Sequence, residues 1–135
     1  MLFTIMKGNV EGYAGGEEPI LHLVSAAQAV QREGGQYVFT DGHGIVVFTN
    51  FFEDLGELDQ VDWTVMKATY WRDTLDDMDR CRRRQAEFLI HDFCPWQLIE
   101  TIGVMTKKMK ATVEELLEGV SHKPVVTVRR EWYYS

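Results

Sequence analysis

The sequence has few cysteines, few prolines and no long apolar run, and each scarcity excludes a class of protein. Of its 135 residues, 2 are cysteines, 3 are prolines and 11 are glycines, which excludes disulfide-rich scaffolds and collagen-like or disordered chains. No apolar run approaches the roughly 20 residues that a membrane-spanning helix needs. The first residues contain neither a basic stretch nor a long apolar stretch, so we expect no signal peptide. Cys81 and Cys94 are therefore predicted to be free thiols in a reducing, cytoplasmic compartment.

Positive charge is also scarce. The chain has 14 Lys and Arg against 21 Asp and Glu, a net charge of -7, which argues against a nucleic-acid binder that works by bulk charge. Four arginines nevertheless lie within five positions, directly after an acidic stretch: Arg80, Arg82, Arg83 and Arg84. Because exposed charges act over about 8–10 Å at physiological ionic strength, such a local cluster can still bind phosphate.

The length predicts a single domain, residues 1–135, that buries about two thirds of its unfolded surface. Hydrophobic and turn-forming residues predict strands at 2–8, 19–25, 36–41, 85–91 and 124–134. Predicted helices cover 26–33, 61–71, 95–104 and 111–120, with Ser25 and Asp62 as N-caps of the first two. We expect a helical segment within 42–60 and a long charged loop over 72–84. Short strands and helices in mixed order, without a regular βαβ repeat, favour the α+β class.

The segment Gln85–His91 places a carboxylate inside an apolar strand. Because strand side chains alternate between faces, we expect Gln85 and Glu87 to share one face, opposite a core face that carries Phe88. A carboxylate beside an amide can hold a hydroxyl or stabilise a cation, and glycosyl transfer passes through a positively charged, oxocarbenium-like transition state. The same pattern is typical of an ordinary solvent-facing strand residue, so the spacing alone leaves both interpretations open.

Other candidate residues are less specific. His43 lies in a glycine-flanked loop, where histidines are either functional or simply solvated. Cys81, His91 and Cys94 could be zinc ligands, but their spacing fits no standard zinc finger. Three aromatic residues at helical spacing are more typical of a core than of a base-stacking surface: Trp63, Tyr70 and Trp71.

Three long stretches carry the motifs of a known family: "MLFTIMKGNVEGYAGGEEPILHLV", "VDWTVMKATYWRDTLDDMDRCRRRQAEFLIHDFCPWQLIETIGV" and "VVTVRREWYY". They resemble, in this order, the central part, the C-terminal half and the last strand of DarT, a family of bacterial toxins that ADP-ribosylate DNA. The resemblance covers essentially the whole chain. It implies an α+β ADP-ribosyltransferase fold, NAD⁺ as co-substrate without a metal, and single-stranded DNA as acceptor. The modified base would be thymine, or guanine as in another branch, and a macrodomain antitoxin of the DarG type would be the partner.

The resemblance also assigns roles to individual residues. "QAE" resembles the Gln/Glu-x-Glu element of ADP-ribosyltransferases, which makes Glu87 the catalytic glutamate and places Gln85 where the acceptor is read. His43 falls near a family histidine and would assist catalysis. The loop from Trp71 to residue 84 would meet the substrate, with its arginines holding phosphates: Arg80, Arg82, Arg83 and Arg84.

One part of the family pattern has no counterpart in this sequence. Family members begin with a further segment, which carries a histidine motif and an arginine for NAD⁺ binding. We therefore expect the chain to be a fragment, a split-gene product or a degenerate relative, with weak or absent NAD⁺ binding. Two other functions stay open: an inactive remnant that binds single-stranded DNA or an antitoxin, and a glycosidase-like hydrolase that pairs Glu87 with a second carboxylate.

Overall fold

The computed structural model describes residues 2–134, and these residues form two compact units. Unit 1 combines the described residues up to Ser25 with those from Pro95 onward. Unit 2 is the continuous segment Ala26–Cys94. Each unit contains its own three-stranded sheet, so the middle of the sequence builds one unit and its two flanks build the other.

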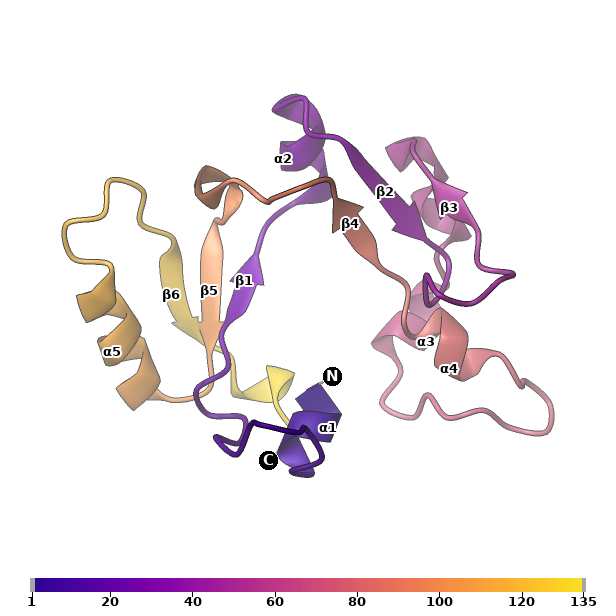
Figure 1. Ribbon diagram of the computed structural model, residues 1–135, viewed down its shortest axis with the longest axis horizontal. Helices are drawn as coiled ribbons and strands as arrows, with labels where there is room; N and C mark the ends of the chain where they lie inside the picture. The colour runs from indigo at the N-terminus through magenta and orange to yellow at the C-terminus, as the bar shows by residue number, and fades with distance from the viewer. Residues whose placement is uncertain (1, 135) are drawn as a thin grey trace. The chain divides into compact units, whose positions relative to one another are not determined.

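The sheet of unit 1 has the strand order β1-β5-β6 (Figure 1). β1 (His22–Val24) runs antiparallel to β5 (Thr101–Val104), and β5 runs parallel to β6 (Val125–Val128). Parallel neighbours need a crossover connection, and α5 (Lys107–Leu116) provides it.

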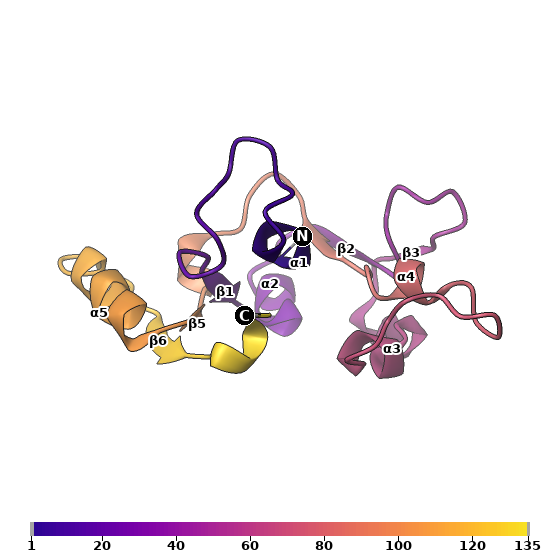
Figure 2. The ribbon, with the colours of Figure 1, turned by 90° about the horizontal axis from the view of Figure 1, so that it is seen from below.

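α5 lies along the sheet of unit 1 and forms the core with it (Figures 1 and 2). Val113 of the helix packs with four buried residues of β5, β6 and the turn before β5: Ile99, Ile102, Val104 and Val126. Thr106 is the N-cap of the helix, and its Oγ1 accepts the N–H of Met109 at 3.1 Å. This N-cap bond explains why the helix starts four residues before the predicted position.

The first helix corrects the strand that was predicted for residues 2–8. α1 (Leu2–Met6) ends before Gly8, whose φ of 70° lies in the left-handed region. The N–H of Asn9 then reaches the carbonyl of Thr4 at 3.0 Å, which is the bond of a Schellman motif. The hydrogen bonds that end this helix favour the helical conformation more than the β-propensity of the apolar residues before it favours a strand.

The two flanks of the chain bond to each other within unit 1. A short 3-10 helix, Arg130–Trp132, leads to Tyr133, whose hydroxyl donates to the carbonyl of Ile20 at 2.6 Å. The N–H of Tyr134 donates to Glu17 Oε1 at 2.9 Å. These bonds attach the residues after β6 to those before β1.

Unit 2 is built on an antiparallel sheet of order β3-β2-β4 (Figure 1). β2 (Tyr37–Thr40) lies between β3 (Phe51–Phe52) and β4 (Phe88–Ile90). On one face, the rings of Tyr37 and Phe88 stack at 5.1 Å, and those of Phe39 and Phe52 at 5.2 Å. The helices of this unit are α2 (Ala27–Arg32), a 3-10 helix (Leu55–Gln60), α3 (Trp63–Lys67) and α4 (Arg80–Arg83).

Several predicted elements are confirmed. The strands predicted at 19–25, 36–41, 85–91 and 124–134 contain β1, β2, β4 and β6, and the helices predicted at 26–33 and 61–71 contain α2 and α3. The helix predicted at 111–120 overlaps the second half of α5. Asp62 caps α3 as expected, because its Oδ1 accepts the N–H of Val65 at 3.0 Å. The mixture of antiparallel strand pairs and short separate helices agrees with the predicted α+β class.

Other predictions were wrong. The helix predicted at 95–104 is a 3-10 turn, Trp96–Leu98, followed by β5, a central strand whose buried apolar run lacks the alternation of an exposed strand. The loop predicted at 72–84 contains α4. The helical segment predicted within 42–60 is confirmed only for its last residues, as a 3-10 helix at Leu55–Gln60, and the residues before it form turns and β3. Ser25 does not cap α2, because Ala26 takes the N-cap position without a side-chain bond. Among residues 2–134, no helix is both apolar and long enough for a bilayer.

Candidate active site around Glu87

Glu87 lies directly before β4 and continues its pairing with β2. The N–H of Thr40 donates to the carbonyl of Glu87 at 2.9 Å, and the N–H of Glu87 donates to Thr40 Oγ1, also at 2.9 Å. Thr40 is fully buried, and its hydroxyl lies 2.7 Å from the carbonyl of Gly42, to which it donates. The backbone of Glu87 is therefore fixed before its side chain makes any contact.

The loop after β2, residues 41–50, holds one oxygen of the Glu87 carboxylate. The N–H of Gly44 donates to Glu87 Oε2 at 3.0 Å. No residue in the described part of the chain donates a hydrogen bond to Oε1, and the Glu87 side chain is 40% exposed. One oxygen is thus anchored to the protein, and the other is available to a substrate.

His43 belongs to the same loop and lies beside the anchored oxygen. Its Nδ1 is 3.7 Å from Glu87 Oε2, which is too long for a hydrogen bond but suits an ion pair when the imidazole is protonated. Nδ1 is buried and has no hydrogen-bond partner within residues 2–134. The structure therefore places His43 and Glu87 in one site, and their catalytic roles stay predictions.

Arg82, one of the predicted phosphate ligands, is bound between two aspartates. Its Nε and Nη2 donate to the two carboxylate oxygens of Asp79, each at 2.7 Å, and its Nη1 donates to Asp41 Oδ1 at 2.8 Å. The hydrogen bond to Asp79 raises the pKa of Arg82 and, in return, lowers the pKa of Asp79. Burial alone would raise the pKa of Asp41, but hydrogen bonds from Asn50 and Arg82 outweigh it, so this pKa is also lowered.

Of the other three predicted arginines, two donate side-chain hydrogen bonds to the protein and one does not. Arg83 donates to Asp62 Oδ2 at 2.9 Å and also to Asp77. Arg80 donates to a backbone carbonyl of the preceding loop at 2.8 Å. Arg84 makes no side-chain hydrogen bond or ion pair to any residue of the described range, and its Nε is buried without a partner. Arg84 is therefore the arginine with the most free donors in this cluster.

Gln85 does not lie beside Glu87 on a strand, which corrects the predicted arrangement. It occupies the turn after α4, where its Nε2 donates to the carbonyl of Cys81 at 2.9 Å. The carbonyl of Trp71 lies 3.7 Å from Sγ of Cys81, a residue of α4. Both residues belong to the segment that precedes Glu87, and their substrate-binding roles stay predictions.

The structure also bears on two weaker interpretations of the sequence. Cys81, His91 and Cys94 do not form a metal site: nowhere in residues 2–134 do three His, Cys, Asp or Glu side chains gather to hold an ion. Trp63 and Tyr70, which were expected in a core, are 47% and 61% exposed because α3 is short and turns only its middle residues inward.

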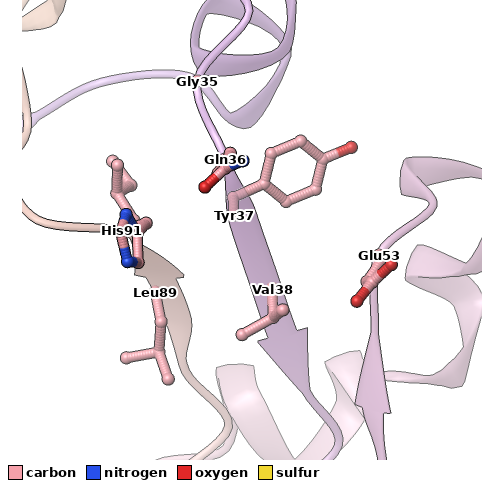
Figure 3. A pocket seen from close by; sticks show the side chains of 8 residues that line it. Gly35, Gln36, Tyr37, Val38, Glu53, Leu89 and His91 are labelled. Carbon is pink, nitrogen blue, oxygen red and sulfur yellow. The ribbon is translucent and has the colours of Figure 1, made fainter.

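A groove of about 640 Å³ lies over the sheet of unit 2 (Figure 3). Val38 and Leu89, which are partners across β2 and β4, form its floor. Glu53 and His91 lie at opposite sides of it (Figure 3). Glu87 precedes Leu89 by two residues, so alternation places both side chains on the same face. The open face of this sheet therefore continues from the Glu87 carboxylate into the groove.

Comparison with known proteins relates the chain to a family. The family model described as "ssDNA thymidine ADP-ribosyltransferase, DarT" matches residues 1–134. The chain belongs to the DarT family. A DNA ADP-ribosyl transferase of Thermus sp. (strain 2.9) is 43% identical over 136 residues, and one of Escherichia coli O127:H6 is 33% identical over 138. These matches cover 99% and 98% of this chain but 63% of each relative, so the chain spans less than two thirds of their length.

Solved DarT structures share the fold. Thermus sp. 2.9 DarT in complex with ADP-ribosylated ssDNA matches with a TM-score of 0.91 at 42% identity, over 98% of this chain and 63% of that one. The same protein in complex with NAD⁺ gives the same TM-score over 66% of its chain. Thermosipho africanus DarTG in complex with ADP-ribose, 14% identical with a TM-score of 0.74, shares the fold over 33% of its length. The predicted ADP-ribosyltransferase-like α+β fold is confirmed.

Sequence reasoning missed the residues that hold Glu87 in place. Thr40, Asp41 and Gly44 all belong to the stretch "TDGHG", in which only His43 was singled out. The signal was a small polar residue, an acid and two glycines directly after a strand, which is typical of a structured loop. Thr40 and Gly44 bond to Glu87 directly, whereas Asp41 accepts from Asn50 and Arg82. These partners could not be read locally, because Thr40 and Glu87 are 47 positions apart.

Proposed function

We propose that this chain carries the catalytic carboxylate of a DNA ADP-ribosyltransferase of the DarT type. The reaction would transfer ADP-ribose from NAD⁺ to a base, thymine, in single-stranded DNA and release nicotinamide. The observation that carries the proposal is the setting of Glu87, with Oε2 anchored by Gly44 and Oε1 available on an open sheet face. The complexes of Thermus sp. 2.9 DarT with NAD⁺ and with ADP-ribosylated ssDNA support it.

The position of Glu87 suits the charge that develops in such a transfer. When the bond between the nicotinamide nitrogen and the anomeric carbon breaks, nicotinamide leaves with the electron pair and the ribose becomes oxocarbenium-like. Glu87 binds a ribose hydroxyl through Oε1, and its negative charge stabilises the cation. An acceptor atom of the base then bonds to the anomeric carbon and releases a proton to solvent. His43, beside Oε2, is the candidate helper that orients the carboxylate.

The surrounding segment supplies candidate contacts to the DNA. Arg84 has free donors and is the first choice for a phosphate contact, whereas Arg80, Arg82 and Arg83 already bond to groups of the protein. Phosphate contacts would position the strand without choosing the base. Gln85, exposed in the turn before Glu87, is the candidate reader of the acceptor. Trp71, at the start of this segment, is a further substrate contact.

The family resemblance also supports a partner and a compartment. A macrodomain antitoxin of the DarG type would remove the modification, and both proteins would work in the cytoplasm, where NAD⁺ and single-stranded DNA are present. Co-expression of such a macrodomain is expected to relieve any growth arrest that this chain causes.

Replacement of Glu87 tests the proposed function. In Glu87→Ala and Glu87→Gln, transfer to a thymine-containing oligonucleotide is expected to fall at least about 100-fold, because one electrostatic contact to the transition state is lost. The matched control is Glu118→Ala, which removes an exposed carboxylate after α5 in unit 1. This variant is expected to keep wild-type activity. Nicotinamide release and the mass of the oligonucleotide measure the reaction, and oligonucleotides with guanine in place of thymine test the base.

Two results would contradict the proposal. Unchanged transfer in Glu87→Ala would remove Glu87 from the reaction. Oligonucleotide binding by the wild-type chain with NAD⁺ consumption at background would instead favour the inactive binding module.

A further inference from the structure

The side chain of Arg82 is bonded in almost every direction in which it can donate. Besides its three bonds to Asp79 and Asp41, its Nη1 donates to Thr49 Oγ1 at 3.3 Å. The side chain is only 12% exposed, and the Phe48 ring lies against the guanidinium, with Cζ 5.3 Å from the ring centroid. A guanidinium has five N–H donors, and four bonds to the protein leave little for a phosphate.

These bonds connect α4 to both ends of the loop at residues 41–50. Asp41 begins the loop, and it also accepts the backbone N–H of Asn50 at 3.1 Å, which closes the base of the loop. Thr49, near the other end, donates its hydroxyl to the carbonyl of His43 at 2.8 Å. The guanidinium of Arg82 therefore contacts the side chains at both ends of this loop.

The backbone of Arg82 holds the middle of the same loop. Its carbonyl accepts the N–H of His43 at 3.0 Å. Between these anchors, Gly42 passes so close to the guanidinium that a Cβ at this position would lie 2.2 Å from Arg82 Nη1. The next residue but one, Gly44, presents its N–H to Glu87 Oε2. The path from Arg82 to the catalytic carboxylate thus consists of three loop residues, Gly42, His43 and Gly44.

We propose that Arg82 is a positioning residue that acts on Glu87 through the loop at residues 41–50, with Asp41 and Asp79 as its fixed partners. The inference rests on the proposed function only in taking Glu87 as the reacting carboxylate. Arg82 sets where the Gly44 N–H lies, and the Gly44 N–H sets which oxygen of Glu87 is left for the substrate. Arg82 then contributes to turnover without touching DNA, unlike Arg84.

The test compares Arg82→Lys with Arg84→Ala in the full chain. Lysine keeps the positive charge but cannot bridge two carboxylates as the planar guanidinium does. In Arg82→Lys, we expect hydrogen exchange of the Gly44 amide to accelerate at least about 10-fold. Because a 1 Å misplacement of a catalytic group can cost about 100-fold, kcat is expected to fall by a similar factor with KM little changed. In Arg84→Ala, the salt dependence of oligonucleotide binding is expected to weaken by about 0.7 in its logarithmic slope, with Gly44 exchange unchanged.

The outcomes separate this inference from the proposed function. Wild-type Gly44 exchange and wild-type kcat in Arg82→Lys would overturn the inference, because Arg82 would then not hold the loop. If the wild-type chain modifies no DNA, the proposed function fails, but Gly44 exchange still decides whether Arg82 holds the loop. Asp41→Asn, which keeps the shape of Asp41 and removes its charge, serves as a second variant if Arg82→Lys does not fold. Asp41→Asn is also expected to accelerate hydrogen exchange of the Gly44 amide. A wild-type exchange rate in this variant would also overturn the inference.

Discussion

At the scale of single residues, the position of the Glu87 carboxylate depends on a neighbour that has no side chain. Gly44 donates its N–H to Glu87 Oε2, and a Cβ on Gly44 would lie 3.0 Å from that oxygen and 3.8 Å from the Phe51 ring. The carboxylate end of Glu87 is flexible enough to move by a few tenths of an ångström. A side chain at position 44 would therefore displace the carboxylate rather than break the fold.

Gly44→Ala is expected to lower turnover while leaving stability nearly unchanged. The free energy of unfolding should change by less than about 1 kcal/mol, whereas kcat for transfer to a thymine-containing oligonucleotide should fall about 10-fold or more. Gly56→Ala is a matched control, because Gly56 also donates to a nearby carboxylate, Asp54, and its Cβ would lie 3.2 Å from that group. Urea denaturation and initial rates check both variants, and wild-type kcat in Gly44→Ala would contradict the expectation.

At the scale of elements, α4 shows how paired charges order a segment that was predicted to be a loop. A helix of four residues is not stable alone, and α4 depends on Arg82 and Arg83, which bond to aspartates outside the helix. Asp62 was predicted correctly as the cap of α3, because capping is a local pattern. The pairing of Arg82 with Asp41 was not predictable, because its partners are 41 positions apart and nothing nearby marks them.

β5 was missed for a related reason. Its neighbours, β1 and β6, come from opposite flanks of the chain. Ile102 and Val104 are buried within the core of unit 1, so the segment shows a continuous apolar run. Such a run does not distinguish a strand from a buried helix. The strand next to Glu87 was predictable from its apolar residues, whereas the loop that holds Glu87 required the folded structure.

The ion pairs of Arg82 with Asp79 and Asp41 predict that the folded chain loses stability in acid. Asp79 and Asp41 have lowered pKa values in the folded chain, so unfolding takes up protons at low pH. The stabilisation is fully present above the unfolded carboxyl pKa of about 4 and is lost as pH falls through the lower folded values. Urea denaturation between pH 7 and 3 should show this loss.

Asp79→Asn should be less stable than wild type at pH 7, and the difference should shrink toward pH 3. Asp59→Asn, which removes an exposed carboxylate of the 3-10 helix, is the control and should follow the wild-type pH dependence. A difference between Asp79→Asn and wild type that does not change with pH would contradict the assignment.

At the scale of the whole molecule, unit 1 is closed by bonds between distant parts of the sequence. The hydroxyl of Tyr133 donates to the carbonyl of Ile20 at 2.6 Å and lies 3.3 Å from that of Gly103. Tyr133 is buried, and burial raises the pKa of its hydroxyl, with the charge of Glu17 acting in the same direction. The family resemblance predicted the fold, but no local pattern indicated that the flanks would form a unit of their own.

Tyr133→Phe is expected to destabilise the chain by about 1–2 kcal/mol, because the buried carbonyl of Ile20 loses its side-chain donor. Tyr134→Phe is the matched control: Tyr134 is 49% exposed, and its hydroxyl makes no hydrogen bond in the described part of the chain. That control should change stability by less than about 0.5 kcal/mol. Thermal denaturation measures both, and equal stability of the two variants would contradict the role of the Tyr133 hydroxyl.

The division of the sequence between the units has a consequence during translation. Residues 26–94, which form unit 2 and include His43 and Glu87, leave the ribosome as one uninterrupted segment. At synthesis rates of 5–20 residues per second, residues 95–134 follow over roughly 2 to 8 seconds. During roughly the first 0.5 to 2 seconds of that interval, until residue 104 has been made, β1 has no partner strand β5. The carboxylate site can therefore assemble on the nascent chain while the first strand of the other unit still exposes an unpaired edge to chaperones and proteases.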